Sequence, residues 1–283
     1  MLEKILIKYK NSRLGGRGLA KIKWLKRIYD FFVYLFRLNL VKVDGRKMFF
    51  DSVTYIYVEE NGGYEPLETA VVKKEMKKGD TAVDIGANAG YYTLLFSETA
   101  GETGHVYAFE PENANYRLLE KNIRLNKAAN VSIEKAEVSD TNGFLTFYKS
   151  AGNAGGHSLF NRSAGTKTVM VKAFRLDDYP ALKEARIDFI KIDVQGAEPA
   201  ALAGMKKILR RSRKLKILME FSPYDLALSG FKPEAPLVIL NRYGFVFYDI
   251  EKKKKTGIKE LLRSYPAAKE KYTNLLCKKA AGK

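Results

Sequence analysis

The sequence predicts an α/β protein built on a doubly wound, mostly parallel sheet, and three observations support this fold class. Apolar, strand-like runs alternate with helical patterns between residues 81 and 250. A glycine-rich turn follows the first of these runs at Gly86, and an acidic residue, Glu110, closes the second. Such alternation buries parallel strands between helices and gathers ligand-binding residues at the carboxyl ends of the strands.

The individual elements follow the hydrophobic pattern in chain order. An amphipathic helix is expected over residues 19–40, and strand-like alternation over residues 47–59 predicts a hairpin or edge strands. The turn N-G-G-Y-E-P-L-E then leads into a helix that carries Glu65 and Glu68 in its first turn. Beyond it we expect strands at 81–85, 106–109, 131–135, 189–193, 216–221 and 246–250, helices at 91–99, 113–126, 199–210 and 232–243, and an antiparallel pair at 144–148 and 168–173.

Positive charge is concentrated at the two ends of the chain. Residues 1–50 contain 13 Lys and Arg against 3 Asp and Glu, and residues 251–283 contain 11 against 3, which accounts for the whole net charge of +18. We therefore predict a basic amphipathic N-terminal helical extension (1–45), a neutral catalytic α/β domain (46–250) and a basic, mainly helical C-terminal tail (251–283). Attraction to an anionic membrane or to nucleic acid would belong to the ends.

Composition is typical of an intracellular enzyme. One cysteine, Cys277, excludes an internal disulfide framework, two histidines are too few for a histidine-based site, and no metal site is expected. The first twenty residues lack the apolar core of a signal peptide. The apolar stretch 31–36 is too short to span a bilayer, so its helix either packs on the core or lies on an anionic membrane. We expect a cytoplasmic protein, with peripheral contact at the inner membrane face as the alternative.

The glycine-rich turn predicts a nucleoside-cofactor site. Residues 83–93 read V-D-I-G-A-N-A-G-Y-Y-T, in which Gly86 and Gly90 let the backbone approach a ligand and the helix start offers N–H groups. Glu110 is placed to accept hydrogen bonds from a ribose diol. The G-x-x-x-G spacing differs from a nicotinamide fingerprint, and Asp84 would repel a pyrophosphate but suits a ligand with an ammonium group. S-adenosylmethionine has these properties.

A second block, D-F-I-K-I-D-V-Q-G-A-E at 188–198, predicts the reacting edge of the site. Its buried strand delivers Asp193 to the edge where the cofactor's sulfonium is expected, Gly196 turns the chain, and Glu198 opens the next helix. The Asn/Asp-Pro-Pro-aromatic motif of many amino-nitrogen methyltransferases does not occur here. Carboxylates suit a hydroxyl nucleophile, which loses its proton as it attacks. Glu198 is either catalytic or a helix N-terminal charge that stabilises the helix dipole.

The polar, glycine-rich segment 150–160 has the composition of a loop over an active site. It contains His157, a group that titrates near neutral pH. His157 could accept a proton or bind substrate hydroxyls, or it could be solvated without a role in the reaction.

These motifs resemble those of the FkbM-type S-adenosylmethionine-dependent methyltransferases. The matching pieces, which cover roughly residues 60–225, are Gly63-Tyr64-Glu65-Pro66 for G-x-Y-E-P with one residue fewer, V-D-I-G-A-N-A-G-Y-Y-T-L at 83–94, V-Y-A-F-E-P at 106–111, L-x-x-N-I-x-L-N at 119–126 and K-I-D-V-Q-G-A-E at 191–198. The resemblance implies a Rossmann-like class I methyltransferase fold. Known members of the family include O-methyltransferases of sugars and polyketide-like natural products.

The resemblance also implies a role for particular residues. Asp84, Gly86, Asn88 and Gly90 would hold the methionyl end of the cofactor, Glu110 the ribose, and Glu137-Val138 the adenine. Glu65 is expected near the cofactor's mouth, and Ala87 and Pro111 belong to the same cofactor-binding motifs. Asp193, Glu198 and His157 are the candidate catalytic residues.

The leading functional hypothesis is an O-methyltransferase that acts on a hydroxyl of a sugar, glycan or related small molecule. The alternative is a tRNA or rRNA methyltransferase, which the net charge of +18 and the pattern E-P-x-N-x-x-x-x-L-x-x-N favour. Against it stand the missing Pro-Pro motif and the neutral core. A peripheral membrane or scaffold protein that binds the cofactor without turnover is a third class. The acceptor and the oligomeric state stay open at this point. Any requirement for a divalent metal is open too, because Asp193 and Glu220 end neighbouring strands.

Overall fold

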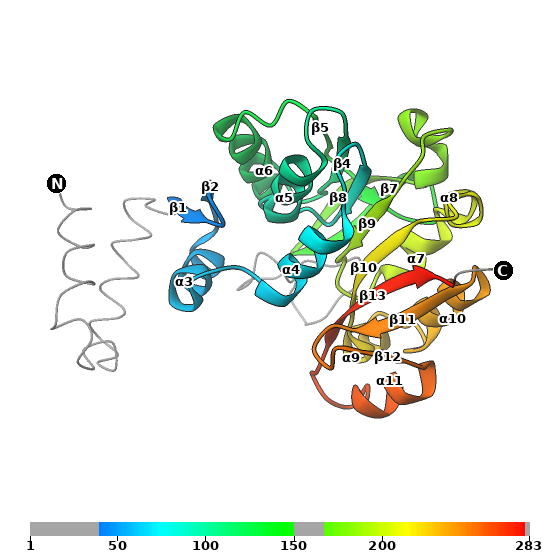
Figure 1. Cartoon of the computed structure of the whole chain (residues 1–283). Helices are drawn as coiled ribbons and strands as arrows, with labels where there is room; N and C mark the ends of the chain where they lie inside the picture. The colour runs from blue at the N-terminus through cyan, green and yellow to red at the C-terminus, as the bar shows by residue number, and fades with distance from the viewer. Residues whose placement is uncertain (1–39, 150–166, 281–283) are drawn as a thin grey trace, which may run out of the picture. The chain divides into compact units, whose positions relative to one another are not determined.

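The computed structural model describes residues 40–149 and 167–280, and Figure 1 shows their arrangement. The chain divides into two compact units, Met1–Tyr64 and Glu65–Lys283. The boundary therefore falls after Tyr64 rather than at residue 45, where we expected it. Most of the amphipathic helix predicted over 19–40, and the loop segment with His157, lie outside the described residues.

The described part of the first unit is a hairpin followed by a helix. Strands β1 (Leu40–Val43) and β2 (Arg46–Phe49) pair antiparallel across Asp44 and Gly45, whose positive φ angles of 47° and 87° suit a tight hairpin turn. Helix α3 (Ser52–Asn61) follows. The prediction of strands over 47–59 was therefore wrong beyond Phe49. The carboxylate of Asp51 accepts hydrogen bonds from the backbone N–H groups of Val53 and Thr54, and this cap starts a helix despite the β-prone sequence.

The second unit is built on a mixed, mostly parallel sheet, as predicted. Its eight strands within the described residues are, in spatial order, β12 (Lys254–Thr256), β11 (Phe245–Asp249), β13 (Thr273–Lys279), β10 (Lys216–Phe221), β9 (Phe189–Ile192), β3 (Thr81–Ile85), β4 (His105–Phe109) and β5 (Val131–Glu134). β10, β9, β3, β4 and β5 pair in parallel, whereas β13 and β12 run antiparallel to their neighbours. The strand order reverses between β3 and β9, and ligands bind at such switch points.

Helices lie on both sides of this sheet (Figure 1). They are α4 (Pro66–Glu75), α5 (Tyr91–Ala100), α6 (Asn113–Leu125), α7 (Glu198–Ala203), α8 (Lys206–Arg211), α9 (Pro223–Leu228), α10 (Ala235–Arg242) and α11 (Ile258–Ser264). The single helix predicted over 199–210 is thus two helices. The break follows from Asp177, whose carboxylate accepts the N–H groups of Lys207 (2.9 Å) and Ile208 (3.0 Å) and caps α8.

A small second sheet carries the residues expected at the adenine. It consists of β6 (Glu137–Val138), β8 (Lys167–Phe174) and β7 (Gly143–Lys149), in that order. β7 and β8 pair antiparallel over their whole length, which confirms the predicted antiparallel pair. β6 and its flanking residues Ala136 and Ser139 are buried, so the side chain of Glu137 lies in the interior of the domain.

The C-terminal segment differs from the helical tail that we expected over 251–283. It contributes the edge strand β12, the short helix α11 and strand β13, which is inserted between β10 and β11. Residues Thr273 to Cys277 are all buried. Periodicity could not separate a strand from a buried helix here, because the apolar run is short and its partners are more than twenty residues away in sequence. Strand β13 is therefore part of the core.

The hydrophobic core lies between the main sheet and the helices. Its fully buried members include Phe109, Ile190, Leu218, Phe221 and Leu275. No helix within residues 40–149 and 167–280 is both long and apolar enough to cross a bilayer.

We expect the substitution Leu275→Ala on β13 to lower the free energy of unfolding by about 2–5 kcal/mol, because it leaves a cavity beside two neighbouring strands. The side chain of Leu275 is 0% exposed, whereas that of Leu228 on α9 is 45% exposed. The control Leu228→Ala should cost under about 1 kcal/mol. Urea unfolding followed by circular dichroism measures both; equal losses would contradict the placement of β13 in the core.

Candidate active site

The glycine-rich turn after β3 is fixed by two close approaches. Gly86 has φ of 79°, and a Cβ atom there would lie 2.0 Å from the backbone oxygen of Asp193. Gly90 has φ of 90°, and a Cβ atom there would lie 2.6 Å from the side chain of Leu119 on α6. Both positions therefore require glycine for conformation and for space. The first contact also joins the turn after β3 to the end of β9.

Hydrogen bonds within the protein hold this turn in place. The N–H groups of Gly86 and Ala87 donate to the carbonyl of Phe109 (3.0 Å each), and that of Asn88 donates to Oε2 of Glu110 (2.8 Å). The N–H of Gly90 donates to the carbonyl of Ala87 (2.8 Å). These four N–H groups therefore have partners in the protein. In the first turn of α5, where we expected free donors, the backbone N–H of Thr93 donates to the carboxylate of Asp84.

Glu110 links the turn to the end of β4. Besides Asn88, its carboxylate accepts the N–H of Glu112 at Oε1 (2.8 Å), and Pro111 between them is buried. Burial raises the pKa of Glu110 to about 7, against the lowering effect of these two backbone hydrogen bonds. Each carboxylate oxygen has a second lone pair, so both can also accept a ribose hydroxyl. Glu110 thus holds the turn in place and keeps acceptor capacity for a further donor.

Two buried carboxylate oxygens have no hydrogen-bond partner among the described residues. Oδ2 of Asp84 accepts the hydroxyl of Thr93 (2.6 Å), but its Oδ1 is unpaired, and so is Oε1 of Glu137. Burial raises the pKa of both groups, that of Glu137 to about 8. Buried acceptors without donors are costly, so such atoms indicate a ligand that supplies donors. An ammonium group would satisfy Asp84 and an exocyclic amine would satisfy Glu137.

The registers of the parallel strands place a buried lysine beside these acids. Lys191 on β9 lies directly opposite Asp84 on β3, and its Nζ is 2.7 Å from Oδ2 of Asp193. The same ammonium lies 4.6 Å from the ring centroid of Tyr92. Burial alone lowers the pKa of Lys191, but the charges of Asp193, Glu65 and Asp84 outweigh it and hold that pKa above its usual value. Lys191 is therefore charged at neutral pH.

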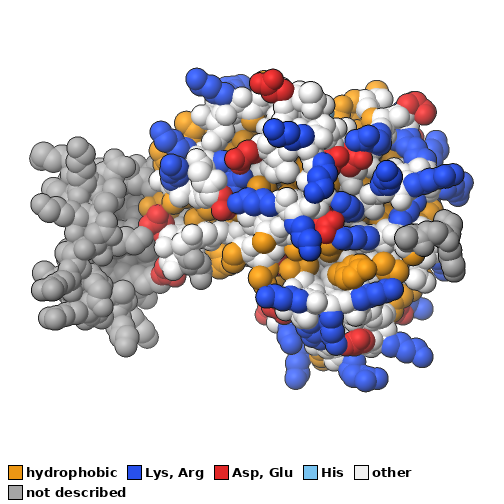
Figure 2. Space-filling view, in the orientation of Figure 1, with side chains coloured by type: hydrophobic (Ala, Val, Ile, Leu, Met, Phe, Trp, Pro, Cys, Tyr) orange, Lys and Arg blue, Asp and Glu red, His pale blue; other side chains and the backbone are white. Residues whose placement is uncertain are grey.

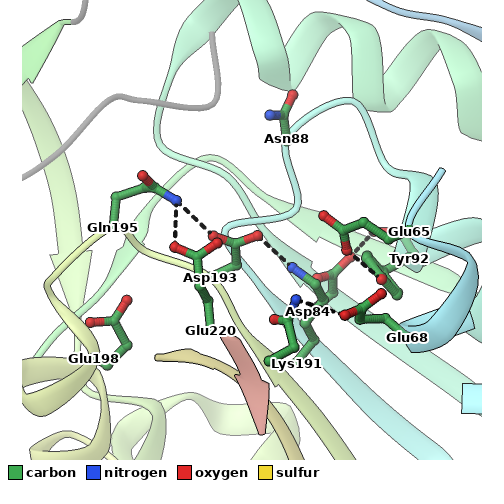
Figure 3. A network of polar contacts seen from close by, with 12 residues as sticks. Glu65, Glu68, Asp84, Asn88, Tyr92, Lys191, Asp193, Gln195, Glu198 and Glu220 are labelled. Atoms are coloured by element: carbon green, nitrogen blue, oxygen red, sulfur yellow. Dashed lines mark hydrogen bonds and ion pairs between the residues drawn. The ribbon is translucent and has the colours of Figure 1, made fainter. Parts of the chain in front are cut away.

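A glutamine joins two carboxylates at the adjacent strand ends (Figure 3). Nε2 of Gln195 donates to Oδ1 of Asp193 (3.1 Å) and to Oε1 of Glu220 on β10 (3.0 Å). Burial raises the pKa of Asp193, but Lys191 and the hydrogen bond from Gln195 outweigh it and keep that pKa below its ordinary value. Burial, followed by the charges of Asp193 and Glu198, raises the pKa of Glu220 well above its ordinary value.

The N-terminal end of α4 adds further carboxylates to the same face. Glu65, at the N-cap position, has an unusual left-handed conformation (φ 44°), and its Oε2 accepts the hydroxyl of Tyr92 (2.5 Å). Glu68, in the first turn, accepts Nδ2 of Asn274 from β13 (3.0 Å). Burial raises the pKa of Glu65. The predicted position of Glu65 and Glu68 at the helix start is thus confirmed, and the C-terminal strand reaches the site.

Glu198 lies apart from this cluster (Figure 3). Its Oε1 accepts the N–H of Gly196 (3.1 Å) at the start of α7, and its side chain is buried. Burial raises its pKa to about 7. This contact is the one that a helix N-terminal carboxylate makes, so the arrangement favours the structural interpretation of Glu198 over direct catalysis.

The structure thus brings together most of the residues that the sequence singled out, and it adds others. Asp84, Asn88, Glu110, Asp193 and Glu65 surround the carboxyl ends of β3, β4 and β9, whereas His157 lies outside the described residues. The further members of the site are Tyr92, Asn122, Lys191, Gln195 and Glu220. Sequence reasoning gave no role to the first four, and it considered Glu220 only together with Asp193, for a divalent metal. Four of these lie within or beside the quoted motifs, and Asn122 holds the turn through the carbonyl of Ala89 (2.8 Å). Among the described residues, no three His, Cys, Asp or Glu side chains are arranged to hold a metal ion.

Comparison with known sequences decides the family. The methyltransferase FkbM domain family matches residues 84–247, which is more than half of the chain. The chain belongs to the FkbM methyltransferase family. It is therefore a methyltransferase, and its cofactor is S-adenosylmethionine. No curated protein matches the sequence.

Solved structures of similar fold are remote in sequence. They include a putative rRNA methylase from Clostridium thermocellum (13% identity, 76% of this chain and 95% of that chain, TM-score 0.47). Fibrillarin from Aeropyrum pernix, with bound S-adenosyl-L-methionine, has 13% identity over 75% of this chain and 74% of that chain (TM-score 0.42). An O-methyltransferase from Thermotoga maritima has 11% identity over 86% of this chain and 78% of that chain (TM-score 0.45). Likeness at this level does not distinguish between acceptors.

The FkbM methyltransferase site fits its cofactor on its own geometry. Oδ1 of Asp84 and Oε1 of Glu137 are buried acceptors without a donor, and they suit an ammonium group and an adenine amine. Each oxygen of Glu110 has a lone pair left for a further donor. When bound, the cofactor supplies a methyl group on a positively charged sulfur.

We expect Glu110→Ala to weaken S-adenosylmethionine binding by about 1–3 kcal/mol, because a buried acceptor for ribose is lost along with the anchor of the turn. The isostere Glu110→Gln should bind with intermediate affinity. In the parent protein the affinity should rise from pH 6 to pH 8, because the carboxyl with a pKa of about 7 becomes a better acceptor when it ionises. Calorimetry measures all three; undiminished binding by the alanine variant would exclude Glu110 from the ribose site.

Proposed function

We propose that this FkbM methyltransferase is an O-methyltransferase that acts on a hydroxyl of a sugar, glycan or related small molecule. The observation that carries the proposal is the pair of half-buried carboxylates, Asp193 and Glu220, at the adjacent carboxyl ends of β9 and β10. A hydroxyl must lose its proton as its oxygen attacks, and a carboxylate within reach can accept that proton. An amine nucleophile is better served by neutral acceptors.

The charge of the site supports a neutral acceptor. Three acidic side chains of the site are partly exposed, namely those of Glu65, Asp193 and Glu220. The ammonium of Lys191, which acts electrostatically on each of them, is buried. A phosphate placed beside these carboxylates would be repelled, and the repulsion is strong in a partly desolvated site. Sugar hydroxyls carry no charge and donate hydrogen bonds to carboxylates. The local charge therefore favours a polyhydroxyl acceptor over a nucleic acid backbone at the reacting centre.

We further propose how the cofactor lies. Asp84, Gly86, Ala87, Asn88 and Gly90 surround its methionyl end. Glu110 and Pro111 contact the ribose, and Glu137 and Val138 the adenine. Glu65 then lies at the mouth, and the sulfonium lies near Asp193. The unpaired oxygens of Asp84 and Glu137 support both ends of this placement.

An RNA acceptor is the second candidate function, because the whole chain carries a net charge of +18. The test is methyl transfer from labelled cofactor to a cell extract that is then separated into RNA, protein, lipid and glycan. We expect the label in glycan or in small polyhydroxyl molecules, and an alkali-stable methyl ether in the product. Label confined to RNA and removed by ribonuclease would replace the proposed acceptor.

We also propose that the basic ends, residues 1–45 and 251–283, attach the enzyme peripherally to an anionic membrane at its inner face. The described part of these ends includes the β12–α11 surface, which we define by its exposed cations Lys252, Lys253, Lys254, Lys255, Lys259, Arg263, Lys269 and Lys271. Figure 2 shows blue side chains gathered in this lower region, where β12 and α11 lie. Lys254 pairs with Glu260 (2.6 Å), but most of the others have no carboxylate partner among the described residues.

Vesicle binding tests the membrane proposal. Each Lys or Arg near an anionic surface contributes about 1 kcal/mol at most, and salt screens it. The triple change Lys253→Gln, Lys255→Gln and Lys259→Gln should therefore weaken binding to phosphatidylserine vesicles at least about tenfold at low salt. A triple change of equal charge on α8, at Lys206, Lys207 and Arg210, is the control. Equal losses in both variants would mean that net charge matters and the β12–α11 surface does not.

A further inference from the structure

We propose that Glu220 is the catalytic base of the methyl transfer and that Gln195 is the positioning residue that holds it beside Asp193. The inference rests on the proposed transfer to a hydroxyl and names the group that receives the proton. No motif in the sequence pointed to this role for Glu220, because it lies on β10, outside the glycine-rich turn and the K-I-D-V-Q-G-A-E block.

The position of Glu220 is set by strand register. Lys191 and Ile192 on β9 pair with Leu218 and Met219 on β10, so Glu220 comes next, beside Asp193, as β9 ends. Alternation along the strands puts Lys191, Asp193 and Glu220 on one face. One amide, Nε2 of Gln195, donates to both carboxylates (3.1 and 3.0 Å), so the two acids lie within reach of the same acceptor molecule.

The two carboxylates differ in their cationic partners. Asp193 forms an ion pair with Lys191 (2.7 Å) and accepts a hydrogen bond from Gln195, so both of its oxygens are engaged. A carboxylate neutralised in this way is a weak proton acceptor. Glu220 accepts a hydrogen bond from the neutral amide of Gln195 at Oε1, and among the described residues no lysine or arginine forms an ion pair with it. Of the two, Glu220 is therefore the stronger base.

The surrounding charges act in the same direction. The carboxylates of Asp193 at the end of β9, Glu198 on α7 and Glu65 at the start of α4 act on Glu220 through their charge, and the ammonium of Lys191 opposes them. Burial and these carboxylates raise the pKa of Glu220 well above its ordinary value. A general base is most effective when its pKa approaches the working pH. A positively charged cofactor at this edge would favour the ionised form that accepts the proton.

The turn that carries Gln195 is held in a conformation that few residues adopt. Gln195 has φ of 50°, in the left-handed region, and Gly196 follows with φ of 95°. A Cβ atom at Gly196 would lie 2.4 Å from Oγ of Ser229 and 2.7 Å from the carbonyl of Asp225. Strained backbone of this kind persists where the surroundings enforce it, often at active sites. The strain here directs one amide at two carboxylates.

The transfer balances with Glu220 as the proton acceptor. The acceptor oxygen forms a bond to the methyl carbon while the carbon–sulfur bond breaks and its electron pair stays on sulfur. The hydroxyl proton passes to the carboxylate of Glu220, and from there to solvent after the product leaves. Asp193 stays ionised throughout because Lys191 remains beside it.

Kinetics of two isosteric variants test the assignment. Glu220→Gln should keep cofactor affinity within about threefold and lose about 10²–10⁴ in kcat. Asp193→Asn should lose less than about tenfold in kcat, and the acid limb of its pH profile should move to lower pH, because a negative neighbour that raises the pKa of Glu220 is gone. The exposed Glu184→Gln is the matched control. A Glu220→Gln rate within about threefold of the parent, or a larger loss in Asp193→Asn, would overturn the proposal.

The positions of the pH limbs give a second criterion. Because the base must be ionised, kcat/KM should rise with pH through a pKa above the ordinary carboxyl range. If Asp193 were the base, the limb would lie below that range, since Lys191 keeps its pKa low. Gln195→Leu, which removes the bridge, should reduce kcat at least tenfold with little change in cofactor affinity. Gln195→Asn should recover less than half of that loss, because it is one methylene shorter.

A readout without turnover separates this inference from the proposed function. In protein labelled with ¹³C at the glutamate carboxyl carbon, several resonances should titrate above the ordinary carboxyl range, and the resonance that is missing in Glu220→Gln should be one of them. In Asp193→Asn the same resonance should titrate at lower pH. An ordinary titration of Glu220 would refute the inference even in an active enzyme. A parent enzyme that transfers no methyl group to any hydroxyl acceptor would refute the proposed function instead.

Discussion

The buried ammonium of Lys191 is the interaction on which the rest of the site depends. It lies opposite Asp84 across the β3–β9 pair, touches Asp193 at 2.7 Å and lies over the ring of Tyr92. Carboxylates crowded at the ends of parallel strands repel one another. Without a cation, several of them would have to be protonated, or their side chains would have to move apart. One lysine allows Asp193 to stay ionised while Glu220 keeps a raised pKa. Asp193 and Glu220, which accept hydrogen bonds from the same amide, thereby acquire different pKa values.

Close backbone packing holds that arrangement rigid. The absence of a side chain at Gly86 lets the turn after β3 lie against the carbonyl of Asp193, so the glycine-rich turn and the end of β9 cannot shift independently. Glu110 holds the same turn from the β4 side through Asn88, and Asn122 holds it from α6 through Ala89. Catalysis by alignment needs such rigidity, because small misplacements of the reacting groups cost large factors in rate.

The candidate active site and the exposed surface of the protein carry charges of opposite sign. The site is rich in carboxylates, while the exposed surface at β12 and α11 is rich in lysine. A basic exterior attracts polyanions over a Debye length, but it acts weakly on a site that carries the opposite charge. If the basic ends attach the enzyme to a membrane as proposed, the net charge of the chain bears on where the enzyme gathers rather than on the group that it methylates.

The sequence by itself determined the family, the cofactor and most of the parallel sheet. The signals that predicted the cofactor site are local in sequence, namely Gly86, Gly90, Asp84 and Glu110. A turn, a strand end and a short spacing between them are enough to predict a nucleoside-cofactor site. Strand β13 and helix α3 were misjudged, since one depends on distant partners and the other on a single capping carboxylate. The pairing of Lys191 with Asp84, and of Gln195 with Glu220, was decided by the tertiary structure alone. Strand order and register bring these residues together across 25 to 107 positions of sequence, and no local pattern encodes which strands become neighbours.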